Sequence, residues 1–509
     1  MENGVIVNSI KCASIEGIEA KVIEVEGSLT KGLPSFNIVG LASSDIQEAK
    51  ERAKNALLAS GFELPPLRIT INLSPSDIKK SGTHFDLAIA TLVALGEQEI
   101  VHKDIFVFGE LGLDGKVKSS SLIFPLILSL KEQGLIDKAV VPKSALKSLS
   151  FIDGIEFFGV DTLIETTELL SKSELPKTDM NKSSYNAKEL KVDNKTYYYS
   201  QDYKLDFADI LGQEVAIRAA LIAASGMHNI LLNGSPGSGK SMIAKRLRYI
   251  LPPLSQSEIL SIARAEFLDG KNPSFAPLRP LRSPHHTATS AAIFGGGSHN
   301  AKIGEVALAN NGILFFDELP HFSSKVLEAL REPLQDRVIN IARVNSKVSY
   351  SANFMFVAAQ NPCPCGNLLS KVNSCRCTDL EIKRYKNRLS DPFLDRIDIF
   401  VTMGEVDFDK KNITDSKTMH ELVIKAFTAQ KKRGQSELNG SLQESDIDRY
   451  CTLEDSAKNI LEQAIVKFGL SFRSIDNIKK VARTIADING NLNITKKDML
   501  EALSYRRRV

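Results

Sequence analysis

The stretch that decides the fold of this chain is Asn229-Ile230-Leu231-Leu232-Asn233-Gly234-Ser235-Pro236-Gly237-Ser238-Gly239-Lys240-Ser241. It opens with a short apolar run typical of a buried strand, and the segment Met242–Leu247 that follows has helical character. The turn between them matches G-x-x-x-x-G-K-[ST] in the strand–loop–helix context that this pattern requires. We therefore predict an α/β core built around a phosphate-binding loop.

The residue types of this loop suit a nucleoside triphosphate and its magnesium ion. Glycines let backbone N–H groups converge on phosphate oxygens, aided by the N-terminus of the following helix. Lys240 is expected to pair with the β- and γ-phosphates, and the Ser241 hydroxyl to bind Mg²⁺. The residues expected to bind ATP are Gly234, Ser235, Pro236, Gly237, Ser238, Gly239, Lys240 and Ser241. The alternative, a chance glycine turn before a helix, does not account for the preceding strand.

Two further apolar strands end in polar residues. The run Gly312–Phe316 leads to Asp317 and Glu318, and the run Phe354–Ala359 leads toward Asn361. At the tip of a central strand, Asp317 would reach Mg²⁺ and Glu318 would polarise an attacking water, while the amide of Asn361 would sense the γ-phosphate. A solvated acidic turn and an ordinary strand-to-turn asparagine are the alternatives. Together with the phosphate loop, these strands predict nucleoside triphosphate hydrolysis.

Length and composition bound the problem. At roughly 100–200 residues per domain, 509 residues correspond to about three domains. The balance of 64 Lys+Arg against 61 Asp+Glu gives a net charge of +3, which excludes a strongly basic coat protein and an acidic tail. It does not exclude nucleic acid, because a local basic stripe can hide in a neutral total. The 43% hydrophobic fraction predicts a soluble globular protein.

The patterning divides the chain into four parts. The N-terminal part mixes strand signals such as Ile69–Leu73 with a helix that Ser44 is expected to cap and Gly61 to end. A stretch rich in Lys, Ser, Asn and Tyr follows, with little periodicity, and the last part is mostly helical. The predicted domains are an α/β domain over 1–170, a linker over 171–205, an α/β ATPase core with a parallel sheet over 206–404, and a helical lid over 405–509.

Neither a leader nor a membrane span is expected. The N-terminus lacks a basic region followed by an apolar stretch. The longest apolar run, 121–128, is interrupted by Pro125 and falls short of the roughly 20 residues of a span. Six cysteines without an export signal indicate a reducing compartment. We expect a cytoplasmic protein with no membrane partner.

Beyond these motifs, the sequence resembles the AAA+ ATPases, and within them the magnesium-chelatase-like branch known as the YifB/ComM family. The resemblance covers nearly the whole chain, and such a string of motifs in this order is highly specific. Its carriers are Asp209–Gln213, Arg282–Thr287, Gly312–Pro320, Arg331–Leu334, Asn361–Gly366 and Leu394–Asp398.

The resemblance implies a homo-oligomeric ring, a hexamer, with ATP and Mg²⁺ at the subunit interfaces. It places Gly212 and Gln213 near the adenine and makes Asn361 sensor 1. Arg396 is similar to the arginine finger that enters the neighbouring subunit's site, and Arg473 to sensor 2 on the helical lid. A finger contributes about 10³–10⁵ in rate by spreading transition-state charge.

Alternatives for the two arginines stay open. Arg396 stands beside Asp395 and Asp398 and could form a simple ion pair, whereas Arg473 could be a surface residue. Arg388 is the second candidate for the finger.

The N-terminal domain resembles the Lon protease domain, with a ribosomal-protein-S5-like fold. Lys79–Asp86 and Phe108–Gly115 carry this likeness. His84 stands where the nucleophilic serine should be and Phe124 where the lysine should be, and a serine without a base does not attack. We expect a non-proteolytic scaffold, with Ser81 as the residual nucleophile candidate.

Four cysteines lie between sensor 1 and the finger. Cys363 and Cys365 form one C-x-C pair, and Cys375 and Cys377 form another. Four thiolates from a short loop suit a tetrahedral structural Zn²⁺, although this spacing is less common than C-x₂-C and free thiols are the alternative. A bound metal would hold the loop between Asn361 and Arg396 rigid.

The segment from Arg337 to Tyr350 is expected to form a hairpin before the sensor 1 strand. Related ring helicases push such a hairpin against the nucleic-acid backbone in the pore, so Arg337, Arg343 and Lys347 are candidates for phosphate contact. Surface charge without that role is the alternative. His285 and His286, in contrast, are interpreted as making ordinary loop hydrogen bonds.

The resemblance implies a DNA-dependent ATPase motor, a branch-migration helicase of the kind that extends strand exchange in recombination and natural transformation. Its DNA would be single-stranded or branched, and no base-reading motif is visible. Two alternatives are a magnesium-chelatase-type motor subunit that remodels a partner protein and a Lon-like protease, which the missing dyad disfavours.

Overall fold

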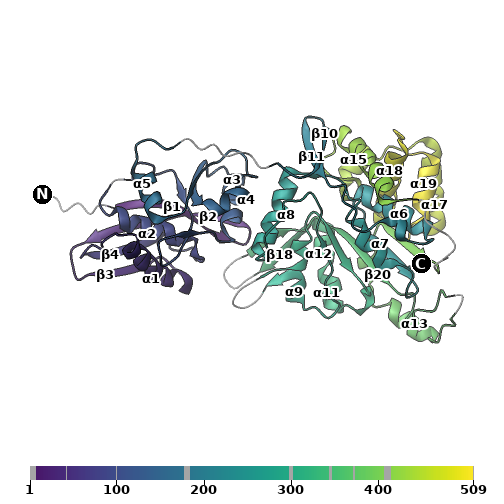
Figure 1. Cartoon of the computed structure of the whole chain (residues 1–509). Helices are drawn as coiled ribbons and strands as arrows, with labels where there is room; N and C mark the ends of the chain where they lie inside the picture. The colour runs from purple at the N-terminus through teal and green to yellow at the C-terminus, as the bar shows by residue number, and fades with distance from the viewer. Residues whose placement is uncertain are drawn as a thin grey trace. The chain divides into compact units, whose positions relative to one another are not determined.

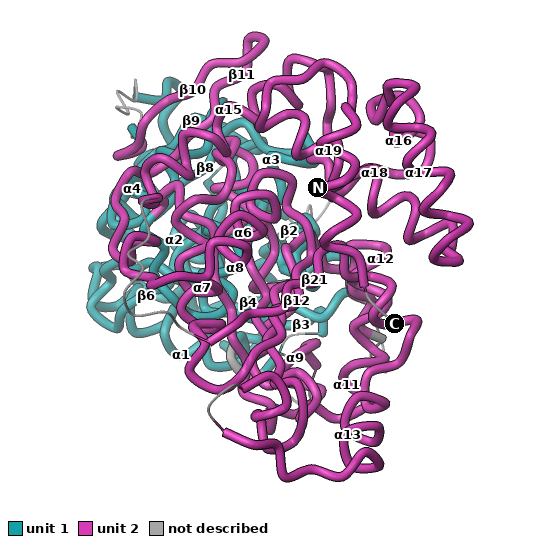
Figure 2. Tube along the Cα trace, turned by 90° about the vertical axis from the view of Figure 1, so that its right-hand side faces the viewer, with its two compact units in different colours: residues 1–184, 263–274 teal, residues 185–262, 275–509 magenta. Residues whose placement is uncertain are grey.

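The computed structural model describes residues 7–41, 43–98, 100–176, 184–296, 302–342, 347–370, 373–405 and 414–507. They form two compact units, coloured separately in Figure 2. Unit 1 comprises Met1–Ser184 and Ala263–Ser274, and unit 2 comprises Tyr185–Ile262 and Phe275–Val509. Each unit has its own sheets, and each is described by itself.

Unit 1 is built on a seven-stranded mixed sheet in the order β3-β4-β2-β1-β5-β8-β9. Antiparallel pairing joins β1, β2 and β4, whereas β3 and the strands from β5 onward pair in parallel with their neighbours. The strands are β1 Val7–Glu16, β2 Glu19–Thr30, β3 Ser35–Val39, β4 Arg68–Ser74, β5 Phe106–Val107, β8 Lys138–Pro142 and β9 Glu156–Val160, with a separate small pair, β6 Glu110–Leu111 and β7 Val117–Lys118.

Helix α2 (Asp86–Leu95) lies at the centre of unit 1, where it packs against β1, β2, α1 and α5 (Figure 1). Its residues are mostly apolar on every face, and nine of the ten are buried, as expected for a helix that is covered on every side. The other helices are α1 Ser44–Ala59, α3 Ile123–Glu132, α4 Leu146–Leu149 and α5 Leu163–Ser171. Helix α1 begins at Ser44 itself, so the cap position belongs to Ser43, one residue before the predicted one.

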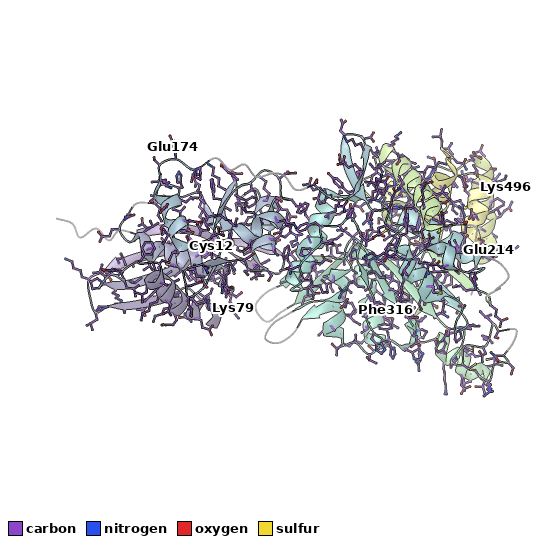
Figure 3. The ribbon with its side chains drawn as sticks, in the orientation of Figure 1. Cys12, Lys79, Glu174, Glu214, Phe316 and Lys496 are labelled. Carbon is purple, nitrogen blue, oxygen red and sulfur yellow. The ribbon has the colours of Figure 1, made fainter. Side chains whose placement is uncertain are left out.

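Unit 2 contains a five-stranded sheet whose neighbours are all parallel, in the order β14-β17-β20-β12-β21. These strands are β12 Ile230–Gly234, β14 Leu281–Arg282, β17 Ile313–Phe316, β20 Met355–Gln360 and β21 Ile399–Met403. All four residues of β17 are buried, and so are the first five of β20, because helices cover both faces of a parallel sheet. Figure 3 labels Phe316, the last residue of β17, within this sheet.

Short helices and hairpins surround this sheet, and longer helices make up the C-terminal region (Figure 1). The helices are α6 Glu214–Gly226, α7 Lys240–Leu247, α8 Gln256–Leu268, α9 Ser290–Phe294, α10 Glu305–Leu308, α11 Ser324–Ala329, α12 Arg331–Asp336, α13 Asp379–Lys386, α14 Asp391–Leu394, α15 Ser416–Lys432, α16 Glu444–Tyr450, α17 Asp455–Phe468, α18 Phe472–Asn489 and α19 Lys496–Ser504. The two-stranded pairs are β15 Gly295–Gly296 with β16 Lys302–Ile303, and β18 Val338–Ala342 with β19 Lys347–Ser351.

The α/β class, the parallel sheet of the ATPase core and the helical C-terminal region are confirmed. The stretch 171–205 differs from the expected irregular linker over part of its length. Strands β10 (Lys188–Val192) and β11 (Lys195–Tyr199) form a hairpin there, and β11 pairs with β13 (Leu254–Ser255). Tyr197 anchors the hairpin by an edge-to-face contact with Phe427 at 4.9 Å between ring centroids. No helix in the described ranges combines the length and apolar character needed to cross a membrane.

Candidate nucleotide and metal sites

The predicted phosphate loop connects β12, which lies between β20 and β21, to the N-terminus of α7. Gly237 and Gly239 have φ angles of +79° and +93°, a conformation that glycine adopts without steric cost. A Cβ atom at Gly237 would meet nothing within 4 Å. The crown of the loop is therefore open, with backbone N–H groups and a helix N-terminus available to phosphate oxygens.

Lys240 joins the loop to the sensor strand. Its ammonium donates to the carbonyls of Gly234 at 2.7 Å and Ser235 at 2.9 Å, and to Asn361 Oδ1 at 3.3 Å. Burial lowers the pKa of Lys240, and the charge of Asp317 opposes that shift. The structure thus brings Lys240 and Asn361 together as the sequence predicts.

Ser241 and the acidic pair form the adjoining corner. The Ser241 hydroxyl donates to Asp317 Oδ2 at 2.8 Å, and the Glu318 backbone N–H donates to Asp317 Oδ1 at 3.0 Å. Strand β17 pairs with β20, which pairs with β12, so the carboxyl ends of these parallel strands deliver Asp317, Asn361 and the loop to one edge. A hydroxyl beside a carboxylate is a donor set that suits Mg²⁺.

His286 lies beside the acidic pair, a contact that the sequence reasoning did not anticipate. Its Nδ1 lies 3.6 Å from Glu318 Oε2, and its ring centroid lies 4.2 Å from that of His285 and 5.8 Å from that of His321. His285 makes the expected loop hydrogen bond, to the Thr287 hydroxyl at 2.8 Å. The sequence signal that could have found this contact is the position of the two histidines along the chain. Both follow β14, the strand that pairs with β17.

The two predicted arginines meet each other. Arg396 and Arg473 both donate to Gln335 Oε1, at 2.6 and 3.2 Å. Arg396 also donates to the Arg331 carbonyl at 3.0 Å. Burial, followed by the charges of Arg473 and Arg331, lowers the pKa of Arg396. Glu328 pairs with Arg331 at 2.6 Å, and the charges of Asp336 and Asp395 partly offset the lowering at Arg396. Guanidinium groups gathered in this way are suited to an anion.

The hydrogen bonds of Arg396 and Arg473 go to parts of the chain other than its own phosphate loop. Within the described part of the chain, neither Arg396 nor Arg473 hydrogen-bonds to that loop. Arg396 bonds to carbonyls and Gln335 rather than to the neighbouring aspartates of the ion-pair alternative. Arg388, the second finger candidate, donates to the Pro320 carbonyl at 3.2 Å, just beyond Glu318.

Gly212 and Gln213 lie immediately before α6, in left-handed conformations with φ of +62° and +63°. The Gln213 side chain donates to the Gly404 carbonyl at 2.7 Å, at the end of β21. This hydrogen bond joins the two residues predicted near the adenine to the edge strand of the ATPase sheet.

The four cysteines of the predicted zinc site come together. The sulfur atoms of Cys363, Cys365, Cys375 and Cys377 all lie within 4.8 Å of one another. Cys363 is 3.4 Å from Cys365 and 3.7 Å from Cys375, and Cys365 is 3.6 Å from Cys375. A Zn–S length of about 2.3 Å gives about 3.8 Å between sulfurs of a tetrahedron. The four thiols therefore have the spacing of a thiolate metal site.

The predicted hairpin exists, but Arg337 is engaged at its base. Its guanidinium donates to the Gly440 carbonyl at 3.3 Å and lies 3.8 Å from Glu437, both in the C-terminal region. Burial lowers its pKa. This geometry favours a structural role over contact with DNA phosphates. Lys347 begins β19, with its side chain outside the described atoms, and Arg343 lies outside the described residues.

Core residues occupy the two positions of unit 1 at which the sequence resemblance placed the serine and the lysine of the Lon protease domain. His84 is fully buried, with a ring nitrogen 2.8 Å from the Ala13 carbonyl, and burial lowers its pKa to about 4. Phe124 is buried in α3 and stacks on Phe267 with ring centroids 4.9 Å apart. Neither residue is exposed to a substrate.

Comparison with known proteins first defines the class. The family model "Magnesium chelatase, subunit ChlI" matches residues 206–411, "Subunit ChlI of Mg-chelatase" matches 25–145, and "Magnesium chelatase, subunit ChlI C-terminal" matches 413–506. The phosphate loop, the acidic pair, Asn361 and the sheet order thus occur in an AAA+ protein of the magnesium-chelatase-like class, for which ATP and Mg²⁺ are the implied cofactors.

Curated relatives specify the family. The chain is 37% identical to "Competence protein ComM" of Haemophilus influenzae over 505 residues, 97% of this chain and 96% of that protein. It is 37% identical to "Uncharacterized protein YifB" of Escherichia coli over 506 residues, 96% of this chain and 95% of that protein. The chain belongs to the YifB/ComM family. A more distant match is "Zygotic DNA replication licensing factor mcm6" of Xenopus tropicalis, 25% identical over 270 residues, 53% of this chain and 27% of that protein.

Proposed function

We propose that this protein is an ATP-hydrolysing ring motor that acts on DNA in the cytoplasm, as a branch-migration helicase in recombination and natural transformation. The observation that carries the hydrolytic part is the convergence of Lys240, Asn361, Asp317 and Ser241 at one edge of the parallel sheet. The DNA part draws support from relatives, one named a competence protein and another a DNA replication licensing factor.

At this site each residue has a distinct task. The loop N–H groups and Lys240 bind the phosphates, and Ser241 and Asp317 hold Mg²⁺, which when bound supplies charge neutralisation on the phosphates. Glu318 accepts a proton from the attacking water as the water oxygen adds in line to the γ-phosphorus. The bond from the γ-phosphorus to the β-phosphate oxygen breaks, and ADP and inorganic phosphate leave. The backbone of Glu318 is left-handed, with φ of +53°, and His286 faces its carboxylate. Asn361, directly after β20, senses the γ-phosphate through its side-chain amide.

The arginine cluster supports assembly into a ring, which we assign as a hexamer. Arg396 and Arg473 share Gln335 and bond to no phosphate-loop residue of their own chain in the described ranges. We infer that both act on the ATP of the adjacent subunit, with the guanidinium groups stabilising transition-state charge. Sensor 2 then works in trans beside the finger.

The hairpin β18–β19 is the proposed DNA-contacting element of the pore. Its strands pair in register from Val338 with Ser351 to Ala342 with Lys347. Because Arg337 bonds to the C-terminal region, Arg343 and Lys347 remain the proposed phosphate contacts. Such contacts recognise the backbone rather than the bases, which fits single-stranded or branched DNA of any sequence.

We also propose that Cys363, Cys365, Cys375 and Cys377 bind one structural Zn²⁺. Thiolate sulfur is a soft ligand, and four such ligands at tetrahedral spacing favour zinc over magnesium or calcium. The four sulfur atoms lie within 4.8 Å of one another, which supports this proposal.

The deciding experiment measures ATP turnover with and without DNA at low salt. Single-stranded, forked and three-stranded substrates should each stimulate turnover, and three-stranded substrates should be branch-migrated. A Lys240→Ala protein serves as the inactive control. The second candidate is a motor subunit that remodels a partner protein, which the chelatase-subunit family models favour. Turnover that no DNA stimulates would support that candidate instead.

A further inference from the structure

The loop that carries the first cysteine pair touches the phosphate loop directly. Gly366, the residue after Cys365, has φ of +80°. A Cβ atom at this position would lie 2.5 Å from Pro236 Cδ and 2.7 Å from Pro236 Cγ, well inside van der Waals contact. The backbone at Gly366 therefore lies flat against the ring of a phosphate-loop residue, at a distance that only glycine permits.

The cysteine cluster determines where Gly366 lies. The Gly366 N–H donates to the Cys363 carbonyl at 3.0 Å, which closes the turn. The Cys365 N–H donates to the sulfur of Cys377 at 3.4 Å, and the Cys363 sulfur lies 3.7 Å from that of Cys375. The turn is thus tied to the second cysteine pair through sulfur. An ion shared by the four thiolates would fix the turn, and the turn would fix Pro236.

The segment is also joined to sensor 1. Cys363 follows Asn361 by two residues and is fully buried, and Asn361 Oδ1 accepts from Lys240 at 3.3 Å. Helix α13 begins two residues after Cys377, at Asp379. The four cysteines consequently lie between two attachments to the nucleotide site, one at Pro236 and one at Asn361.

We propose that the four-cysteine site is a brace for the phosphate loop, so that binding of a thiophilic divalent cation, Zn²⁺, sets the affinity for ATP. This inference deepens the proposed function and rests on it, because it assumes that the loop binds ATP. The physical reason is preorganisation: a loop already held in its binding conformation loses less conformational freedom when phosphate binds. Loss of the metal frees the turn at Gly366 and removes the contact that holds Pro236.

The first arm of the test removes the ligands. Metal content and equilibrium binding of a fluorescent ATP analogue are measured for wild type and for Cys375→Ala/Cys377→Ala. The double variant should lose one equivalent of zinc and bind the analogue about tenfold more weakly. The control is Cys12→Ala, a buried cysteine outside the cluster, which should keep both zinc and affinity. Wild type stripped by a chelator and then resupplied with Zn²⁺ should lose and regain affinity on the same chain.

The second arm tests the contact while keeping all four ligands. Gly366→Ala should retain zinc and still bind the analogue about tenfold more weakly, because its methyl group displaces Pro236. Gly434→Ala is the matched control: Gly434 has φ of +81°, so an alanine there meets the same backbone strain, but its Cβ would meet nothing within 4 Å. This control should bind the analogue as wild type does.

The outcomes separate this inference from the proposed function. Metal-free protein that binds the analogue with wild-type affinity overturns the brace, and so does a wild-type affinity of Gly366→Ala. Protein that neither carries nor takes up zinc also overturns it. In each of these cases the proposed ATP site survives if Lys240→Ala still abolishes binding. If Lys240→Ala binds normally, the proposed function itself fails.

Discussion

Each unit contains a loop with a lysine and a glycine that leads into a helix, yet the two loops differ in what occupies them. In unit 1, Gly82 has φ of +108° and precedes α2, and a Cβ there would lie 2.7 Å from His84 Nδ1. In unit 2, a Cβ at Gly237 would meet nothing within 4 Å. The first loop is filled by its own chain, whereas the second is open.

The lysines differ in the same way. Lys80 is fully buried, and its ammonium donates to the Pro75 carbonyl. Lys240 is 8% exposed, and its ammonium donates to Asn361 Oδ1, directly after strand β20. A glycine-rich turn with a lysine becomes a binding site only where the fold leaves the turn open and delivers further functional groups to it. The loop of unit 1 meets neither condition.

The largest expected effect on ATP turnover comes from substitutions at the open phosphate loop of unit 2 and its acidic pair, with the filled loop of unit 1 unchanged. Lys240→Ala should abolish ATP binding and turnover, because the phosphates lose their buried cation. Glu318→Gln should bind ATP but turn over about 10²–10⁴-fold more slowly, since it cannot accept the proton of water. Steady-state ATPase assays and nucleotide binding measure both.

Lys80→Met is the matched control for this pair. It should leave the turnover of correctly folded protein unchanged, because Lys80 serves the packing of unit 1. Wild-type turnover in Lys240→Ala would contradict the assignment of the open loop.

The arginine cluster gives the next effect. Arg396→Ala should lower turnover about 10³-fold while sparing nucleotide binding, because a finger acts only on the transition-state charge. Mixing this variant with Lys240→Ala subunits should restore part of the activity, since each supplies what the other lacks at a shared interface. Absence of rescue at every mixing ratio would argue that Arg396 acts within its own subunit.

His286 should have a smaller effect. His286→Ala should lower kcat about tenfold with little change in KM, because Glu318 loses its neighbour at 3.6 Å while the ATP-binding groups stay in place. His286→Asn, which keeps a polar group, should recover part of the loss. The control His285→Ala removes a histidine whose hydrogen bond stays within its own loop and should be near wild type. If His286→Ala and His285→Ala lower kcat to the same extent, His286 has only a structural role.

The smallest effect concerns the filled loop and appears in stability rather than turnover. The pKa of His84 is lowered to about 4, so between about pH 6.5 and pH 4 the unfolded chain binds a proton that the buried ring does not. Stability therefore falls as pH falls through that window, by at most about 3 kcal/mol from this group.

His84→Phe should make thermal unfolding less sensitive to acid, measured as the difference in Tm between pH 7 and pH 5. The exchange His102→Gln, at a partly exposed histidine of the same unit, is the control and should leave that difference unchanged. A His84→Phe protein with the wild-type pH dependence would contradict the burial argument.

Much of the nucleotide site could be predicted because its parts are local. The phosphate loop is contiguous, and the strand before Asp317 is recognisable from its apolar run alone. The edge at which Asp317 and Asn361 meet follows from the rule that parallel strands present their carboxyl ends together. The cysteine cluster was predictable for a similar reason, since its two C-x-C pairs lie in one short loop.

Other features required the folded chain. The interpretation of His286 as an ordinary loop residue did not anticipate Glu318, because the contact depends on β14 pairing with β17. Arg337 looked like a free cation, but the C-terminal region supplies the Gly440 carbonyl and Glu437, about 100 positions later. The stretch 188–199 lacked a clear period, and its hairpin is stabilised by Phe427 from α15.

The sequence by itself determined which functional groups this protein carries: a glycine-rich loop with a lysine and a hydroxyl, an acidic pair, an amide after a buried strand, four thiols and two arginines. It did so because each of these depends on residue type and on short spacings along the chain. The tertiary structure alone decided that Arg396 and Arg473 meet at Gln335, that Gly366 rests on Pro236 and that His84 fills the loop of unit 1. Some of these contacts join elements that are distant in sequence, and others depend on which atoms fill a turn. Only the packing of the folded chain determines both kinds of contact.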